Sequence, residues 1–137
     1  MPPHVLLVED NADDVELTIR AFEKIGLTDQ VKVIGDGTEA LDYLLGLGAY
    51  SGQERPVLPK IILLDLSLPK TPGLEVLRRI RLSPATRDLP VVVLTVSRKE
   101  PDLLQSFTMG ISDYVIKPLD PARFGRIYKK YVQADPA

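Results

Sequence analysis

Short apolar segments alternate with amphipathic segments five times along this 137-residue chain, and that alternation restricts the possible folds more than any other feature. The clearest apolar segment, residues 61–64, reads Ile-Ile-Leu-Leu, which is typical of a strand buried on both faces of a parallel sheet. The other expected strands are residues 5–8, 31–34, 91–94 and 114–116. This pattern predicts an α/β fold with a five-stranded parallel sheet and helices on both faces. With right-handed crossovers, one known order for such a sheet is the flavodoxin-like order 2-1-3-4-5.

The segments between the strands carry apolar residues at helical spacing. The first helix is expected to begin at Asp13 or Asp14, because negative charge is favourable at a helix N-terminus, and to be closed by Gly26 in a left-handed conformation. The last helix is expected to have Asp120 as its N-cap and Pro121 at its first position, and to continue almost to the C-terminus. Three further helices are expected around residues 40–45, 74–80 and 103–109.

Residues 46–59 form a long connector between the second helix and the third strand. The segment contains three glycines and two prolines. Most helix-to-strand connections in such folds have about 2–6 residues. An insertion is the preferred interpretation of the connector, and a contact surface is the alternative.

The composition excludes several classes of function. The formal net charge is -2, so there is no basic excess that would predict binding to nucleic acid or an anionic membrane. The absence of cysteine excludes disulfides and thiolate metal sites. No apolar run approaches the ~20 residues of a membrane span, and the N-terminus does not resemble a signal peptide. We therefore expect a single cytoplasmic domain over residues 1–137.

Polar side chains follow four of the five expected strands. Glu9 and Asp10 follow the first strand, Asp65 the third, Thr95 the fourth and Lys117 the fifth. Each residue alone has a plain explanation: a solvated helix lead-in, a β-forming strand end, or a surface lysine. Because the carboxyl ends of parallel strands lie along one edge of a sheet, where such folds bind ligands, the five residues together predict a site.

The chemistry of this group favours a divalent cation and a phosphoryl group. Three neighbouring carboxylates repel one another and raise each other's pKa unless a cation compensates, and Mg²⁺ prefers such oxygen ligands. Lys117 can supply a further positive charge to a phosphoryl oxygen. Aspartate is an established covalent nucleophile for phosphoryl groups. Asp65 is the best candidate because its strand is the most hydrophobic and is expected to be central.

The motifs at this edge resemble the receiver domain of two-component response regulators. The matching segments are Val-Glu-Asp-Asn at 8–11, Leu-Leu-Asp-Leu at 63–66, Pro69 with Gly73, Leu-Thr at 94–95 and Tyr-Val-Ile-Lys-Pro at 114–118. They occur in the family's order and span nearly the whole chain. The resemblance implies that Asp65 is the phosphoacceptor, supplied by a phosphohistidine of a sensor histidine kinase. It also implies a signalling switch, whose chemistry is its own magnesium-dependent phosphorylation and dephosphorylation.

The resemblance assigns roles to the other residues. It implies that Mg²⁺, or Mn²⁺, is held by Asp10, Asp65, the backbone carbonyl of Ser67 and, through water, Glu9. It implies that Lys117 contacts the phosphoryl group and that the Lys117–Pro118 peptide is cis. Thr95 would hydrogen-bond the phosphoryl oxygen, and Tyr114 would rotate inward behind it.

Within the family, the chain is similar to the stand-alone receivers that partner bacterial phytochromes. The features are Leu-Pro-Lys at 68–70, the connector 46–59 and the expected absence of an output domain. This similarity implies a bacteriophytochrome kinase as the partner and a homodimer formed by the fourth helix, fifth strand and fifth helix. Tyr128 and Tyr131 would then be interface aromatics, although packing on the sheet is an equal alternative for Tyr131.

Some residues depart from the family pattern. Val96 follows Thr95, where a small residue is usual and where a branched side chain could narrow access to an acyl phosphate. Leu68 and Thr71-Pro72 replace the usual residues of the loop. His4, the only histidine, precedes the first strand at the edge opposite the acidic residues, so we expect no catalytic role for it.

Three other functions compete with this interpretation. A phosphatase of the haloacid dehalogenase type also uses an aspartyl nucleophile, but it needs a second aspartate two residues later, where this chain has Ser67. A flavin-binding module would need a phosphate-binding loop after the first strand, where residues 9–14 are mostly acidic. A degenerate receiver that only docks is disfavoured because every acidic position and the lysine position are filled.

Overall fold

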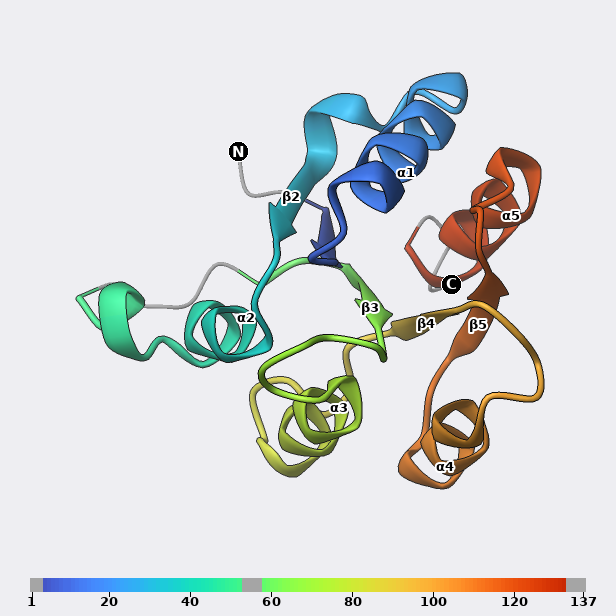
Figure 1. The fold of residues 1–137 in the computed structure, drawn as a ribbon. Coiled ribbons are helices and arrows are strands. Elements are labelled where there is room, and N and C mark those ends of the chain that lie inside the picture. Colours follow the sequence, from blue (N-terminus) through green and yellow to red (C-terminus); the bar gives the residue numbers. More distant parts are fainter. Residues whose placement is uncertain (1–3, 53–57, 133–137) are drawn as a thin grey trace.

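The structure, a computed structural model, describes residues 4–52 and 58–132, which form one five-stranded sheet with surrounding helices (Figure 1). The strands are β1 (Val5–Val8), β2 (Val31–Ile34), β3 (Ile61–Asp65), β4 (Val91–Thr95) and β5 (Asp113–Ile116). Neighbouring strands are all parallel, in the order β2-β1-β3-β4-β5. The predicted fold class and strand order are therefore confirmed, and β3 is the central strand.

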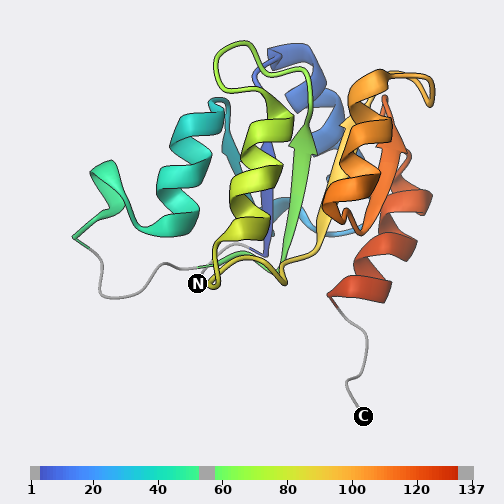
Figure 2. The same ribbon diagram turned by 90° about the horizontal axis from the view of Figure 1, so that it is seen from below.

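The helices cover both faces of the sheet. They are α1 (Ala12–Lys24), α2 (Gly37–Leu45), α3 (Gly73–Leu82), α4 (Pro101–Met109) and α5 (Pro121–Tyr131), with short 3-10 turns η1 (Thr28–Gln30) and η2 (Gly48–Tyr50). Helices α1 and α5 lie on one face, and α2, α3 and α4 lie side by side on the other (Figures 1 and 2). Because every strand runs in the same direction, the loops that follow the strands share one edge, seen at the top of Figure 2.

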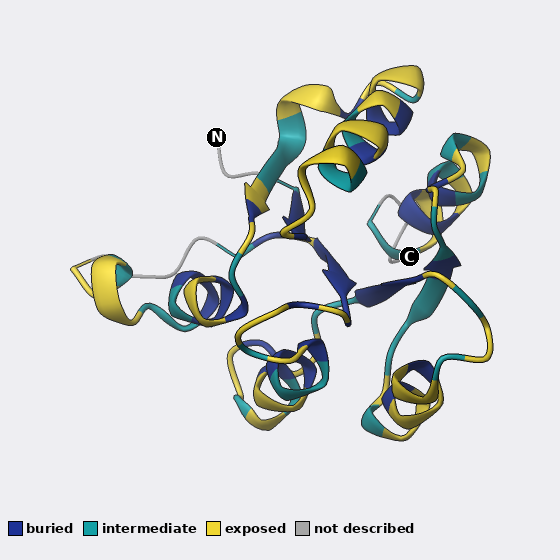
Figure 3. Cartoon of the chain, in the orientation of Figure 1, coloured by how far each residue is buried: buried dark blue, intermediate teal, exposed yellow. Residues whose placement is uncertain are grey.

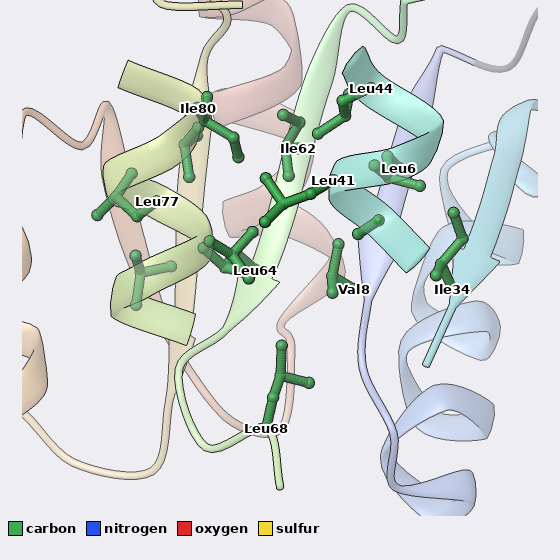
Figure 4. Packing of buried hydrophobic residues seen from close by; sticks show 14 of the residues in the cluster. Leu6, Val8, Ile34, Leu41, Leu44, Ile62, Leu64, Leu68, Leu77 and Ile80 are labelled. Atoms are coloured by element: carbon green, nitrogen blue, oxygen red, sulfur yellow. The ribbon is translucent and has the colours of Figure 1, made fainter. Parts of the chain in front are cut away.

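Two apolar layers explain why the three central strands, β1, β3 and β4, are hydrophobic runs. All residues of β3 are buried, and the central strands are dark blue in Figure 3. On one face Leu64 packs with Leu77 of α3 (Figure 4). On the other face Leu63 lies in a second cluster with Phe22 of α1 and Phe124 of α5, whose ring centroids are 5.1 Å apart. A strand with both faces buried has no room for the polar alternation of a surface strand.

The start of α1 differs from the prediction. The helix begins at Ala12, and Asn11 is its N-cap: the Asn11 side chain accepts a hydrogen bond of 3.0 Å from the backbone nitrogen of Asp14. The predicted start at Asp13 or Asp14 is therefore wrong, because an asparagine side chain can cap a helix as well as an aspartate can. Gly26 lies just beyond the helix with φ of 75°, the left-handed conformation that was predicted.

The cap of α5 is confirmed, but its end is not. The Asp120 side chain accepts a hydrogen bond of 3.0 Å from the backbone nitrogen of Arg123, and Pro121 is the first helical residue. The helix ends at Tyr131, earlier than predicted. The rest of the predicted helix falls mostly on residues 133–137, which lie outside the described part of the chain.

The two tyrosines of α5 pack within their own domain. Tyr128 is 4% exposed, and its hydroxyl is hydrogen-bonded to His4 Nδ1 at 2.9 Å. The Tyr131 hydroxyl donates a hydrogen bond of 2.8 Å to the carbonyl oxygen of Ser112. The interpretation of Tyr128 as an interface aromatic is therefore wrong, because the apolar core takes up its ring. Tyr131 follows the alternative of packing on its own sheet.

Helix α4 buries only part of its apolar surface. Leu103 is 1% exposed, whereas Leu104 is 57% and Phe107 48% exposed. The helix predicted around residues 103–109 is confirmed. One of its faces presents large apolar side chains to solvent.

The described part of the connector folds back on α2. The rings of Tyr50 in η2 and Tyr43 in α2 meet edge to face with centroids 5.2 Å apart. The Tyr50 hydroxyl also donates a hydrogen bond of 3.3 Å to Glu39. The described part of the connector therefore packs on its own domain, and whether the segment is an insertion or a contact surface stays a prediction; residues 53–57 lie outside the described part.

Candidate functional site

The predicted acidic residues converge where β1 and β3 end. Glu9 and Asp10 directly follow β1, and Asp65 is the last residue of β3, the neighbour of β1. One carboxylate oxygen of each residue lies within 4.8 Å of the other two. Glu9 and Asp65 are 1% and 3% exposed, whereas Asp10 is exposed. Two carboxylates are thus set into the sheet edge, and the third faces solvent.

The ammonium group of Lys117 lies among carboxylates. Its Nζ is 2.5 Å from Glu9 Oε1, 3.0 Å from Asp14 Oδ2 and 3.1 Å from Asp65 Oδ2. Burial alone would lower the pKa of Lys117, but these carboxylates raise it well above its ordinary value of 10.5. Lys117 is therefore charged at neutral pH and balances part of the negative charge of the cluster.

The backbone around Lys117 fixes where this side chain starts. The Lys117 backbone nitrogen donates a hydrogen bond of 2.7 Å to the carbonyl oxygen of Thr95, which extends the pairing of β5 with β4. The Lys117–Pro118 peptide is cis, as the family resemblance implied. From this position at the sheet edge the side chain reaches the end of β3.

Glu9 has one oxygen whose hydrogen bonding is incomplete. Its Oε2 accepts a hydrogen bond of 3.3 Å from the backbone nitrogen of Asn11. Its Oε1 lies close to the Lys117 ammonium but has no partner with hydrogen-bond geometry in the described residues. Burial, and then the adjacent Asp65 carboxylate, raises the pKa of Glu9 from 4.5 to about 7. A second cation at the Glu9 carboxylate, in addition to Lys117, would favour its charged form and lower this pKa.

Both oxygens of Asp65 are held in place. Oδ1 accepts a hydrogen bond of 2.9 Å from the backbone nitrogen of Ser67, and Oδ2 accepts one of 3.1 Å from Lys117 Nζ. Ser67 itself is exposed, at the start of the loop between β3 and α3. Asp65 is thus a positioned carboxylate whose two oxygens face a backbone amide and a cation.

Thr95 and Tyr114 lie near the site but engage other partners. The Thr95 hydroxyl donates a hydrogen bond of 3.1 Å to the carbonyl oxygen of Ser97. The Tyr114 ring meets Phe107 of α4 edge to face at 5.9 Å, and the Arg123 guanidinium lies 5.9 Å from its centroid. Neither hydroxyl bonds to Asp65 in the contacts of the described residues, so the structure does not bring these two predicted residues into the acidic cluster.

Asp14 is a site residue that was not predicted from the sequence. Its carboxylate contacts Lys117, although 103 positions separate the two residues. The signal was available in the sequence: Asn11 can cap a helix that starts at the ligand-binding edge, and this start places Asp14 in the first turn. The predicted start at Asp13 or Asp14 rested on the favourable charge at a helix N-terminus and did not show which acid of the first turn faces Lys117.

Residues 5–129 match the protein family described as the response regulator receiver domain. The chain belongs to this family. The match covers all strands of the sheet and every residue of the site, so the receiver domain identified from the sequence motifs is confirmed.

Several known proteins are similar to this receiver domain. The "Probable methanogenesis regulatory protein FilR2" of Methanothrix harundinacea is 45% identical over 115 residues, which are 84% of this chain and 72% of the relative. Response regulator Rcp1 of Synechocystis sp. is 36% identical over 116 residues, 85% of this chain and 77% of the relative. The solved structure of the bacteriophytochrome response regulator AtBRR is 42% identical with a TM-score of 0.84, covering 100% of this chain and 97% of that one. The solved Mn²⁺-bound form of response regulator Rcp1 is 32% identical with a TM-score of 0.76, covering 99% of this chain and 100% of that one.

The donor atoms of the receiver domain fit a hard divalent cation. The carboxylates of Glu9, Asp10 and Asp65 supply oxygen ligands, and the chain has no cysteine to supply sulfur. The incomplete hydrogen bonding of Glu9 Oε1 and the raised pKa of Glu9 mark a place where a positive charge in addition to Lys117 would be stabilising. The acidic group that was predicted at this edge is therefore present and suits Mg²⁺ or Mn²⁺.

Two of the competing functions, the phosphatase and the flavin-binding module, receive no support. The family match gives none to a haloacid dehalogenase phosphatase, and Ser67 stands where that mechanism needs a second aspartate. Acidic side chains, not a phosphate-binding loop, follow β1.

Among the described residues, no helix has both the length and the apolar character needed to cross a membrane.

Proposed function

We propose that this receiver domain accepts a phosphoryl group on Asp65 from a phosphohistidine of a sensor histidine kinase, in a reaction that requires Mg²⁺ or Mn²⁺. The observation that carries the proposal is the position of Asp65: a buried carboxylate at the end of the central strand, within 4.8 Å of two further carboxylates and 3.1 Å from the Lys117 ammonium. Such a site combines a nucleophile, a place for a metal and a second cation, the parts that phosphoryl transfer needs.

Each group has a distinct part in this proposal. Glu9, Asp10 and Asp65, with the backbone carbonyl of Ser67, would hold the metal. The bound metal would neutralise charge on the phosphoryl oxygens. An oxygen of Asp65 attacks phosphorus and forms the O–P bond while the P–N bond of phosphohistidine breaks. The electron pair returns to the imidazole nitrogen, which is left to take up a proton. Lys117 stabilises the charge on the transferred group.

The switch would begin at Thr95. We propose that the hydroxyl leaves the carbonyl of Ser97, which it now contacts at 3.1 Å, and donates to a phosphoryl oxygen on Asp65. That movement would draw the β4–α4 loop inward and open space for Tyr114 to turn from its contact with Phe107. Phosphorylation would thus change the surface of α4, β5 and α5.

The same surface is the proposed homodimer interface. Its support is the exposure of Leu104 and Phe107 on α4, since large exposed apolar side chains often mark interaction sites. The similarity to AtBRR supports a bacteriophytochrome as the partner kinase. We propose that the domain acts in the cytoplasm and carries its output through this surface and not by binding nucleic acid.

Intact-mass measurement tests the central step. With Mg²⁺ and acetyl phosphate or a phosphoramidate, the wild type should gain one phosphoryl group, and Asp65→Asn should gain none. Asp36→Asn is a matched control, because Asp36 caps α2 after β2, which β1 separates from β3, and should leave labelling unchanged. Equal labelling of wild type and Asp65→Asn would place the acceptor elsewhere. A separate experiment, timed phosphoryl transfer from candidate sensor kinases to the wild type, would identify the partner.

A further inference from the structure

Three carboxylates surround the Lys117 ammonium, but only two belong to the acidic cluster of Glu9, Asp10 and Asp65. Glu9 and Asp65 contact Nζ and also lie among the oxygens that suit a divalent cation. Asp14 contacts Nζ at 3.0 Å and is not part of that group. A metal and the ammonium therefore compete for Glu9 and Asp65, whereas Asp14 is available to the ammonium alone.

The position of Asp14 is fixed by the start of α1. Its backbone nitrogen donates to the Asn11 side chain at 3.0 Å, which ties the first turn of the helix to the loop after β1. Its side chain is 33% exposed, and the side chain of Lys117 is 14% exposed. The pair therefore lies at the outer side of the site and is more sheltered than the surface ion pairs that contribute little.

We propose that Asp14 is a positioning residue: it takes over the Lys117 ammonium when a divalent cation engages Glu9 and Asp65. This inference rests on the proposed function, because it concerns the same metal site. Bringing a cation to Glu9 and Asp65 weakens their attraction for Lys117. With Asp14 present, the ammonium keeps a charged partner and stays beside Asp65. Without Asp14, Glu9 and Asp65 are the only carboxylate partners of the ammonium among the described residues. The ammonium then competes more strongly with the cation for these two carboxylates.

Metal affinity tests the proposal without any phosphorylation. Electron paramagnetic resonance reports free Mn²⁺ in a titration of the full chain. Asp14→Asn should weaken Mn²⁺ binding by about three- to tenfold, the size expected for one partly sheltered charged hydrogen bond. Asp13→Asn is the matched control. It removes the same charge from the same helical turn, and Asp13 is exposed and forms no ion pair within the described residues. It should weaken binding by less than Asp14→Asn.

The same substitutions in a Lys117→Gln variant separate an effect through the Lys117 ammonium from the loss of one negative charge near the metal. In Lys117→Gln there is no ammonium to take over, so Asp14→Asn and Asp13→Asn should weaken Mn²⁺ binding equally. An excess effect of Asp14→Asn that persists in Lys117→Gln would overturn the proposal, as would equal effects of the two substitutions in the wild-type background. Circular dichroism confirms that each isosteric variant is folded.

The outcomes distinguish this inference from the proposed function. A wild type that binds no Mn²⁺ overturns both the metal site and the role of Asp14. A wild type that binds Mn²⁺ but is not labelled at Asp65 overturns only the phosphoacceptor. Labelling at Asp65 with no difference between Asp13→Asn and Asp14→Asn overturns only the positioning role.

Discussion

Gly73 lies against the backbone of Asp65, and the contact leaves no room for a side chain. A β-carbon built on Gly73 would be 2.6 Å from the carbonyl oxygen of Asp65 and closer still to the backbone of Leu66. The first residue of α3 thus packs directly on the end of β3. The loop between them is closed by this contact, which fixes the backbone that carries the candidate phosphoacceptor.

Gly73→Ala should therefore destabilise the protein and slow phosphorylation together. The added methyl group must push backbone, not a flexible side chain, and we expect a loss of about 1–3 kcal/mol in the free energy of unfolding. Urea unfolding measures the stability, and intact mass measures the rate of labelling. Gly52→Ala is the control: a β-carbon there would have no atom within 4 Å, so its effect should stay within about 0.5 kcal/mol. Equal stabilities for the two variants would contradict the packing argument.

The raised pKa of Glu9 predicts an unusual pH dependence for the metal-free protein. Glu9 has a pKa of about 7 in the folded state and about 4.5 when unfolded, so the folded state binds more protons between these values. Its contribution to stability is present below pH 4.5 and is lost as the pH rises towards 7. Urea unfolding of wild type and Glu9→Gln with a chelator present, at several pH values in this window, measures the effect. Glu9→Gln should gain stability relative to wild type as pH rises; parallel curves would show that Glu9 does not titrate in this range.

The sequence was sufficient for the sheet because its three central strands are buried on both faces. An uninterrupted run such as residues 61–64 has few alternatives in a domain of this size, and Asp65 at its end marks the ligand edge. The convergence of residues 9, 10, 65 and 117 follows from the sheet, because its parallel topology brings the ends of β1, β3 and β5 to one edge.

Side-chain directions could not be predicted in the same way. The apolar pattern of α5 was correct, but it does not say that Tyr128 turns inward to His4. The strand order places Thr95 at the ligand edge but does not reveal its bond to Ser97. Asp14 was missed because the start of a helix, even when predicted to within two residues, does not show which acid of the first turn faces Lys117. These features depend on rotamers and caps, which a periodicity of polar and apolar residues does not encode.

Thr95→Ala should separate phosphorylation from switching. The Asp65 carboxylate is held by Ser67 and Lys117 and not by Thr95, so the variant should still gain a phosphoryl group. Without the hydroxyl, the β4–α4 loop has no bond to draw it towards the phosphoryl group. Hydrogen exchange of α4, β5 and α5 before and after labelling measures the response. Thr95→Ser keeps the hydroxyl and should behave like wild type. The same exchange changes in Thr95→Ala and wild type would assign the switch to another residue.

Leu104 should contribute to self-association through α4, and a polar substitution there should weaken it. The side chain is 57% exposed, so Leu104→Asn removes apolar surface available to a partner while leaving the core intact. Sedimentation velocity over a range of concentrations, with and without phosphorylation, measures the fraction of dimer. Leu47→Asn is a matched control, since Leu47 is 43% exposed but lies between α2 and η2, towards the opposite end of the sheet from β5. Of the two variants, only Leu104→Asn should dissociate at a higher protein concentration than the wild-type dimer. If Leu47→Asn weakens association as much as Leu104→Asn, the contact between copies does not depend on the α4 face.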